Sequence, residues 1–513
     1  MRTISHGKNL IIILCLTCFL PFLAGSEPDK NSYHHISVEL KGQAVNNWTV
    51  TPDIDNDGFN EFISQSGNKI SIYQLIGKDK PDLKITGTFQ IPENVFVYCF
   101  TKLPGEPAGC LLGITPDGVD AFAFTDGTFG KTPRNLLKIT SDIFRGTSAT
   151  PFLNNFIYGS IIVIPRLEKF TIAKYDAGAK QFNISQEINI PIRAAVKISD
   201  EITEEISSAV FIPVFYFMDM NNDSRDDFLV WFDEYLYLFL QDEKGAFAAP
   251  GNNQAAIDLS LSRRKMRDQE LEYQIIPSIK DINNDKFPDI LVSNGSKGIN
   301  AVYLNRAGKN GIYFQEQKPD YVKNISGWII SQDLADINND GLGDLIIVFM
   351  GKVGVTSGLR ILLAHSINWE MDIYLGKKGK DGKLFYSNNP DYVRFMDIPF
   401  TFSLDPSLIT VKTPFFLDFS HDLNKDNIND LMIKESASNR IFIYCGNTKT
   451  VFSASSDVTL ALKAPVDFSS DDIPYGKPFV TDFNNDGIPD VIFYLQDFKG
   501  LDHFFEFFLS AKN

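Results

Sequence analysis

Several residue types and motifs are scarce in this chain, and each shortage excludes a class of protein. Only 5 Cys and 6 His occur in 513 residues, which excludes a disulfide-stapled scaffold and a histidine-rich metal site. Lys and Arg total 48 against 64 Asp and Glu, giving a net charge of -16. This acidic balance argues against nucleic acid or an anionic membrane as the main partner and favours cations. Because the sequence has no G-x-S-x-G, H-E-x-x-H or P-loop motif, it favours a binding module over an enzyme.

The first 25 residues have the pattern of a secretory signal peptide. Arg2 and Lys8 form a basic start, and a mostly apolar run over 10–23 is followed by small residues. That run is too short for a membrane span, and no later stretch of about 18 residues is continuously apolar. We therefore expect residues 1–25 to be a cleaved signal. The mature chain, 26–513, is then expected to be secreted, periplasmic or at the cell surface, with no transmembrane segment.

The cysteines outside this segment give a limited prediction. Cys99 and Cys110 lie on either side of a turn rich in Pro and Gly. In an oxidising compartment they can form a disulfide, or they can remain two buried thiols, and the sequence leaves both open. Cys445 follows an apolar run and is expected in the core.

What the chain does contain is an internal repeat. One nine-residue pattern occurs six times: Asp, an apolar residue, Asn or Asp, any residue, Asp, three variable residues, then Asp or Glu. The residue after position 9 is also apolar in every copy, so each acidic loop is expected to join two strands that enter a core. The copies are DIDNDGFNE from Asp53, DMNNDSRDD from Asp219, DINNDKFPD from Asp281, DINNDGLGD from Asp336, DLNKDNIND from Asp422 and DFNNDGIPD from Asp482.

The spacing of these residues predicts cation coordination. Side chains at positions 1, 3, 5 and 9, with the carbonyl of position 7, can converge on one ion if the loop curls tightly. All of these ligands are oxygens, which favours Ca²⁺ over Mg²⁺ or Mn²⁺. We therefore expect up to six structural Ca²⁺ sites. The candidate metal ligands are Asp53, Asp55, Asp57 and Glu61; Asp219, Asn221, Asp223 and Asp227; Asp281, Asn283, Asp285 and Asp289; Asp336, Asn338, Asp340 and Asp344; Asp422, Asn424, Asp426 and Asp430; and Asp482, Asn484, Asp486 and Asp490.

Two details separate these loops from other acidic turns. An EF-hand needs Glu at position 12, whereas position 12 is apolar in five of the six copies. Gly or Asn at position 6 suits a sharp turn in four loops, but Ser224 and Lys286 occupy it in the other two. We expect the loops from Asp219 and Asp281 to bind more weakly. A single copy could be an ordinary Asn-Asp-Gly turn, but turns alone do not require acids at positions 1, 5 and 9 in all six.

At this point the chain resembles a known family. The six loops are similar to those of FG-GAP/VCBS repeats in integrin-α-like β-propellers, whose cation loops have the form D-x-[DN]-x-D-G-x-x-D. The resemblance covers the chain from about residue 33 to its end. It implies an all-β fold, a single β-propeller, and Ca²⁺ with a structural rather than a catalytic role. In that family the loop joins the first two strands of a blade.

The spacing of the loops predicts the number of blades. Their starts are 166, 62, 55, 86 and 60 residues apart. Since a gap of 55–62 residues corresponds to one blade, the first gap spans three blades, and two of these lack the motif. Eight blades are therefore favoured, with seven as the alternative if the first gap holds one large degenerate unit. The 86-residue gap indicates an insertion within about 352–411. The strands expected in the two blades without the motif are Val95–Thr101, Leu111–Thr115, Val119–Thr125, Phe156–Pro165 and Lys169–Tyr175.

The ends of the chain predict how the ring closes. After Asp490 only two strands remain, at 491–496 and 503–510, so the last blade lacks an outer strand. Residues Tyr33–Leu40 precede the first loop's own strand and can supply the missing one. Such a clasp would remove an exposed sheet edge.

Together these observations predict an exported Ca²⁺-binding β-propeller of one domain, monomeric, that binds a protein or glycan through its inter-blade loops as an adhesion or interaction module. Two alternatives stay open: a propeller-based polysaccharide lyase or hydrolase, and an architectural subunit of an envelope complex. The basic segment 263–267 is either a contact for an acidic partner or an exposed charged loop.

Overall fold

In a computed structural model the chain folds into strands, and the described residues contain no helix. No segment among them could therefore cross a membrane as a helix. The structure describes residues 33–41, 45–77, 81–140, 150–190, 194–198, 206–210, 213–232, 235–249, 256–259, 274–294, 297–306, 312, 314–315, 318–351, 366–380, 383–399, 416–434, 439–448, 451–463, 475–496 and 502–510. The expected signal peptide and the basic segment 263–267 lie outside these ranges.

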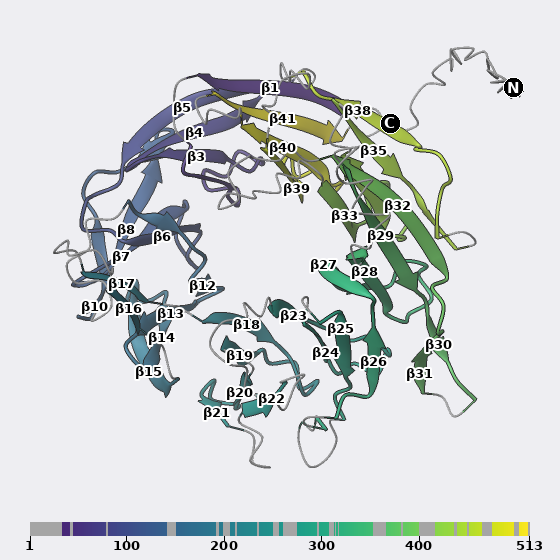
Figure 1. The fold of residues 1–513 in the computed structure, drawn as a ribbon. Coiled ribbons are helices and arrows are strands. Elements are labelled where there is room, and N and C mark those ends of the chain that lie inside the picture. The colour runs from purple at the N-terminus through teal and green to yellow at the C-terminus, as the bar shows by residue number, and fades with distance from the viewer. Residues whose placement is uncertain are drawn as a thin grey trace, which may run out of the picture.

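The strands form eight small sheets arranged as a ring, which confirms the eight-bladed β-propeller (Figure 1). Blade 1 contains β2 (Asn47–Val50), β3 (Phe62–Ser66), β4 (Lys69–Ile76) and β5 (Asp82–Gln90). Blade 2 contains β6 (Val97–Thr101), β7 (Cys110–Thr115), β8 (Gly118–Thr125), β9 (Thr128–Phe129), β10 (Arg134–Lys138) and β11 (Phe152–Leu153). Blade 3 contains β12 (Ile157–Tyr158), β13 (Ile161–Arg166), β14 (Lys169–Asp176) and β15 (Gln181–Asn189). The hairpin β16 (Ala194–Ile198) and β17 (Ile206–Val210) follows.

The second half of the chain completes the ring. Blade 4 contains β18 (Val214–Met218), β19 (Asp227–Phe232), β20 (Tyr235–Gln241), β21 (Phe247–Ala248) and β22 (Ala256–Asp258). Blade 5 contains β23 (Gln274–Lys280), β24 (Asp289–Asn294), β25 (Ile299–Tyr303) and β26 (Tyr321–Asn324). Blade 6 contains β27 (Gly327–Ala335), β28 (Asp344–Gly351), β29 (Ser366–Tyr374) and β32 (Tyr392–Pro399), with the hairpin β30 (Gly376–Lys378) and β31 (Leu384–Tyr386) between the last two. Blade 7 contains β33 (Phe416–His421), β34 (Asp430–Lys434), β35 (Arg440–Tyr444) and β38 (Val458–Ala461), with the pair β36 (Gly446–Asn447) and β37 (Val451–Phe452).

Blade 8 confirms the predicted clasp. Its strands β39 (Tyr475–Thr481), β40 (Asp490–Gln496) and β41 (Asp502–Ser510) come from the C-terminal end of the chain, and β1 (Tyr33–Lys41) adds to β41 as the outer strand. The register is antiparallel and unbroken from Tyr33 opposite Ser510 to Lys41 opposite Asp502. The first described strand therefore closes the ring and covers the edge that β41 would otherwise expose.

The core lies between neighbouring blades, because the second strand of most blades is buried on both faces. Every residue of β19, β24 and β34 is buried. The apolar residue at position 2 of each acidic loop is also buried, which anchors the loop to this core. The six acidic loops each leave the innermost strand of a blade. They therefore all lie at the same end of the ring.

The two blades without the motif are present, with one correction. The single strand expected over Phe156–Pro165 is two strands, β12 and β13, separated by a turn at Gly159, whose φ is +55°. This short turn stands where other blades carry the nine-residue acidic loop. In blade 2 the corresponding connection, 102–109, has no repeat of three acids. Cys99 and Cys110 are buried free thiols rather than a disulfide, and Cys445 is only half-buried.

Candidate metal centres

Each of the six acidic loops has the same backbone form. Positions 4 and 6 both have positive φ in every copy, for example 68° at Asn56 with 97° at Gly58, and 61° at Asn284 with 74° at Lys286. These left-handed residues curl the loop so that its side chains turn inward. The predicted turn at position 6 is confirmed, and Ser224 and Lys286 adopt it despite having side chains. The second turn, at position 4, was not predicted, although Asn stands there in five of six loops and tolerates this conformation well.

The carboxylate at position 9 forms the floor of each loop. It is fully or almost fully buried in all six copies. One oxygen accepts the N–H of position 2, as Asp430 does from Leu423 at 2.8 Å. In the five Asp copies the other oxygen accepts an N–H at or just after the end of the third strand of the blade, as Asp430 does from Gly446 at 2.9 Å. The position-9 side chain thus ties the loop to two strands.

The carboxylates at positions 1 and 5 organise the rest of the loop. Position 1 accepts the N–H of position 6, at 2.8 Å from Gly341 to Asp336 and at 2.7 Å from Lys286 to Asp281. Position 5 accepts the N–H of position 7, at 2.9 Å from Leu342 to Asp340. These hydrogen bonds fix the side chains at positions 1 and 5 against the backbone of the loop. Among the described residues, three or more acidic groups lie within 4.8 Å of one another only in the Asp53 loop.

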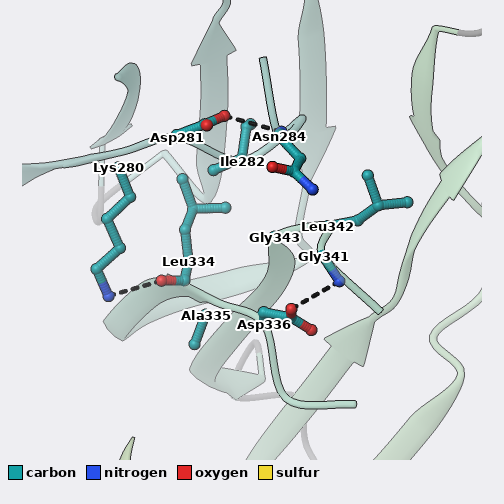
Figure 2. A pocket seen from close by; sticks show the side chains of 10 residues that line it. All are labelled: Lys280, Asp281, Ile282, Asn284, Leu334, Ala335, Asp336, Gly341, Leu342 and Gly343. Atoms are coloured by element: carbon teal, nitrogen blue, oxygen red, sulfur yellow. Dashed lines mark hydrogen bonds between the residues drawn. The ribbon is translucent and has the colours of Figure 1, made fainter. Parts of the chain in front are cut away.

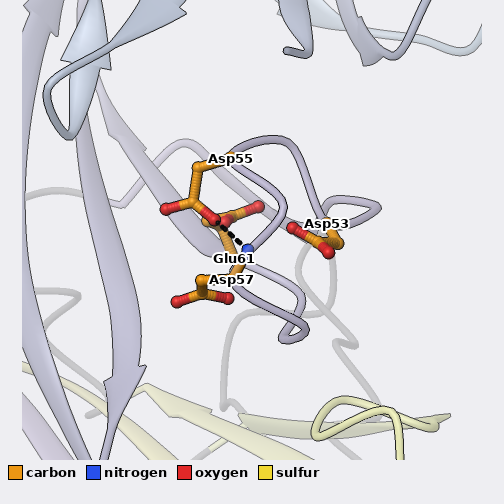
Figure 3. Close-up of side chains that lie close together, drawn as sticks. All are labelled: Asp53, Asp55, Asp57 and Glu61. Atoms are coloured by element: carbon orange, nitrogen blue, oxygen red, sulfur yellow. Dashed lines mark hydrogen bonds between the residues drawn. The ribbon is translucent and has the colours of Figure 1, made fainter. Parts of the chain in front are cut away.

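The Asp53 loop brings all four of its predicted ligands together. One carboxylate oxygen from each of Asp53, Asp55, Asp57 and Glu61 lies within 4.8 Å of the other three (Figure 3). The Asp55 side chain also contacts Gln74 on β4. Such crowding of negative charge opposes ionisation of the whole set, and a bound cation would relieve it.

The other five loops have Asn at position 3, which changes one contact. The side-chain amide of Asn338 donates to Asp340 at 3.0 Å, and that of Asn424 donates to Asp426 at 3.1 Å. In the Asp219 loop, Arg225 also reaches the position-5 carboxylate of Asp223 at 2.5 Å. This ion pair would compete with a cation for Asp223, in the same direction as the weaker binding expected for that loop.

Burial raises the pKa of the position-9 carboxyl in every loop. Desolvation is the main cause; neighbouring loop carboxylates add to it where they act, and hydrogen bonds from backbone N–H groups partly offset it. The pKa rises to about 8 for Glu61 and Asp289, to about 7 for Asp344, and to about 6 for Asp227, Asp430 and Asp490. Without a cation, the position-9 carboxyls of the Asp53, Asp281 and Asp336 loops would therefore hold protons near neutral pH.

Neighbouring loops touch one another around the ring. The N–H of Gly343 donates to the Ile282 carbonyl at 2.7 Å, linking position 8 of one loop to position 2 of the loop before it. Asn60 makes the same link to Phe483 at 3.1 Å. Position 8 of the Asp281 loop is Pro288, which has no N–H to donate. The side chain of Asn305 donates instead to the carbonyl of Met220, position 2 of the loop before it, at 2.8 Å. None of these links was predictable from the repeat alone.

A cavity of about 160 Å³ lies between the Asp281 and Asp336 loops (Figure 2). Its lining combines apolar side chains such as Leu334 with the first aspartate of each loop. Lys280 crosses from blade 5 to blade 6 at this point and donates to the Leu334 carbonyl at 2.7 Å. Most of the lining residues belong to these two candidate cation loops, so the cavity lies where the loops meet.

Comparisons with known proteins agree with the predicted resemblance. Residues 281–347, which include the Asp281 and Asp336 loops, match the FG-GAP-like repeat. The rest of the architecture, an all-β ring of eight blades, fits the propellers expected from that resemblance. No curated protein sequence matches the chain.

Solved structures with a similar fold are distant in sequence. BBS1N in complex with ARL6DN is 7% identical, with 91% of this chain and 95% of that chain covered and a TM-score of 0.37. The periplasmic gluconolactonase PpgL of Pseudomonas aeruginosa is 8% identical, covering 82% and 98% with a TM-score of 0.33. The biofilm matrix protein Bap1 of V. cholerae is 10% identical, covering 94% and 91% with a TM-score of 0.34. Similarity at this level supports no conclusion about this chain's ligand or activity.

Proposed function

We propose that this chain is an exported, Ca²⁺-binding β-propeller that acts as a protein- or glycan-binding module. The observation that carries the metal part is the Asp53 loop, where four carboxylates lie within 4.8 Å of one another. Four negative charges at this separation repel strongly unless a cation or protons offset them. A multivalent cation does so while leaving each oxygen in place.

The same role is proposed for the other five loops. They share the left-handed residues at positions 4 and 6, the buried position-9 carboxylate and the all-oxygen ligand set. Four side chains and one backbone carbonyl, completed by water, suit the six to eight oxygen ligands that Ca²⁺ prefers. Mg²⁺ and Mn²⁺ are second choices because they demand a tighter octahedral shell.

The ions would have a structural role. Each loop joins the innermost strand of a blade to its neighbour, and in the five Asp copies position 9 also accepts an N–H at or just after the end of the third strand. A cation bound there would tie three strands of one blade together. The mature chain, 26–513, is proposed as one monomeric propeller domain after a cleaved signal, in the extracellular, periplasmic or cell-surface compartment, where free Ca²⁺ is plentiful.

Two measurements on the mature protein test the metal. Isothermal titration of the chelator-treated protein should show several bound Ca²⁺ ions per chain, and thermal unfolding should shift upward from EGTA to millimolar Ca²⁺. The Asp57→Asn variant should bind one ion fewer than the wild type. No Ca²⁺ binding, with identical unfolding in both buffers, would mean that the loops are only turns.

The binding role needs a separate test. A glycan array and affinity capture from the producing cell's envelope, both run in Ca²⁺, should yield a specific ligand. Depolymerisation of acidic polysaccharides by the purified chain would instead favour a lyase or hydrolase. Co-purification only as part of a stable envelope complex would favour the architectural role.

A further inference from the structure

A group of buried polar side chains between blades 5 and 6 has no counterpart in the acidic loops. Within the described ranges, six of their atoms have no hydrogen-bond partner: Ser293 Oγ, Asn300 Nδ2 and Oδ1, Gln332 Nε2 and Oε1, and Asp372 Oδ1. The four residues are between 0% and 8% exposed. Buried polar atoms are almost always paired with protein or ordered solvent. The group therefore indicates an occupant that the described residues do not supply.

The blade 5 members share one face of their sheet. Ser293 on β24 lies directly opposite Asn300 on β25. Side chains alternate along a strand, so Ser293 points to the same side as Leu291, and Asn300 to the same side as Val302. Leu291 and Val302 belong to the apolar cluster shared by blades 5 and 6. Ser293 and Asn300 therefore point into the interface between these two blades.

The blade 6 members point toward them. Gln332 on β27 and Asp372 on β29 are both directly opposite Ile347 on β28, one on each side. Ile347 lies in the same apolar cluster as Leu291. Two polar pairs therefore point into the interface between the blades: Ser293 with Asn300 from blade 5, and Gln332 with Asp372 from blade 6.

Asp372 shares a side-chain hydrogen bond with Glu370, and burial raises the pKa of both carboxyls. Tyr374 donates to Asp372 Oδ2 at 2.8 Å, and the Lys323 ammonium lies 4.0 Å from the centre of the Tyr374 ring. Burial lowers the pKa of Lys323, and the charge of Asp372 opposes that shift. The side chains left without partners are then two neutral amides, one hydroxyl and one carboxylate oxygen.

This mixture selects the chemistry of the occupant. The two amides offer N–H donors and carbonyl acceptors side by side, so a cation would leave the donors unpaired and an anion would leave the acceptors unpaired. A hydroxyl group donates and accepts at once and satisfies both. We propose that blades 5 and 6 enclose a binding site for neutral hydroxyl groups, supplied either by ordered water or by a small polyol such as a sugar residue.

The outer edge of the interface gives access to this site. On β32, Val393 lies opposite Asp372, and Phe395 lies opposite Glu370. Exposure rises from 5% at Asp372 to 39% at Val393 and 63% at Phe395. A sugar could therefore enter from the rim, with an exposed aromatic ring beside its path. The site lies outside the acidic loops, so it stands apart from the proposed Ca²⁺ role.

A high-resolution crystal structure of the whole mature protein, grown without polyols and then soaked in glucose, glycerol or galactose, tests the occupant. Discrete oxygen peaks hydrogen-bonded to at least four of the six atoms would support water, and connected density would support a polyol. Side chains that pair with one another around an empty space would overturn the proposal, as would anomalous density from an ion. None of these results bears on the proposed role of the cation loops.

Ligand-observed NMR with the same three compounds shows whether a polyol binds in solution, which distinguishes a polyol occupant from ordered water. Where the soak shows a bound polyol, Asn300→Leu should weaken its binding at least about tenfold, since one lost neutral hydrogen bond plus an unpaired group corresponds to that factor. The control is Gln65→Leu, another buried amide, whose partners include the Pro151 carbonyl at 2.6 Å. It should leave polyol binding unchanged. Equal losses in both variants would overturn a polyol site here.

Discussion

The side-chain amide of Asn485 donates to the backbone carbonyl of Gly58 at 3.0 Å, although the two residues lie 427 positions apart in the sequence. Asn485 belongs to the last acidic loop and Gly58 to the first. Asn60 adds two more hydrogen bonds across the same seam, to the carbonyls of Phe483 and Asp482 at 3.1 and 2.8 Å. The ring is thus closed at one end by acidic loops and at its outer edge by β1.

The loop side of this seam can be weakened without straining the backbone. Asn485→Gly removes the side chain but keeps the positive φ of 54° accessible. We expect a loss of about 1 kcal/mol of unfolding free energy, the usual contribution of one hydrogen bond. The control is Asn339→Gly, at the same loop position with φ of 55°. In denaturant, Asn485→Gly should have a lower free energy of unfolding than Asn339→Gly. Equal free energies would show that the contact between Asn485 and Gly58 contributes nothing to stability.

The strand side of the seam should matter more. Deleting 26–41 removes β1, including Ile36 and Leu40, which are buried against blades 1 and 8. It also leaves Glu506 without its contacts to His35 and Ser37. We expect the exposed β41 edge to cause aggregation, visible by size-exclusion chromatography and light scattering. Deleting only 26–32 should leave a monomer, whereas a stable monomer after the longer deletion would refute the clasp.

A single loop can be disabled at position 5. Asp340→Ala removes the carboxylate that accepts the Leu342 N–H at 2.9 Å. Isothermal titration should find one Ca²⁺ fewer per chain, and the Ca²⁺-dependent rise in Tm should shrink. Asp117→Ala, an exposed aspartate outside the loops, should change neither. An unchanged stoichiometry for Asp340→Ala would exclude the Asp336 loop as a cation site.

Lys286 offers a stabilising change. Its φ of 74° is a left-handed conformation that costs a residue with a side chain about 1–2 kcal/mol. Glycine adopts it freely but loses about 0.5–1 kcal/mol of chain entropy on folding. Lys286→Gly should therefore raise the unfolding free energy by about 0.5–1 kcal/mol, measured in denaturant. Lys286→Ala keeps the strained φ and should bring no such gain; a similar gain would mean that removing the lysine charge is responsible.

The features that could be predicted from this sequence are those encoded within a few residues. The nine-residue repeat carries its acids, its buried position 2 and its following strand together, so the loops and their blades were predictable. The clasp followed from counting strands after Asp490. The break between β12 and β13 was missed because Gly159-Ser160 is a short turn inside a mostly apolar run.

The features that were missed depend on residues far apart in the chain. The pairing of Asn485 with Gly58 and the joining of blades 5 and 6 in one apolar cluster depend on how neighbouring blades are packed, which no local pattern encodes. The left-handed residue at position 4 is an intermediate case. Its sequence signal, Asn in five of six loops, was present, but it reads equally well as part of an ordinary turn.

The raised pKa of the position-9 carboxyls predicts a pH dependence that reverses with Ca²⁺. Asp289 has a pKa of about 8 when folded against a usual 3.8. Between these values the metal-free folded state holds a proton that the unfolded state has released. Its stability is therefore greatest below the unfolded pKa and falls as pH rises through the folded one. With Ca²⁺ the sign reverses, because the ion needs the ionised carboxylate and protons compete with it.

We therefore expect the Tm in EGTA to fall between about pH 5.5 and pH 8, and the Tm in millimolar Ca²⁺ to rise over the same range. Other ionisable groups add their own slopes, so the informative quantity is the difference between the wild type and Asp289→Asn, which cannot titrate at that position. In EGTA the variant should lose less stability with rising pH than the wild type. In Ca²⁺ its Tm should rise less. Parallel curves for the two proteins in both buffers would mean that Asp289 neither holds a proton nor contributes to a cation site.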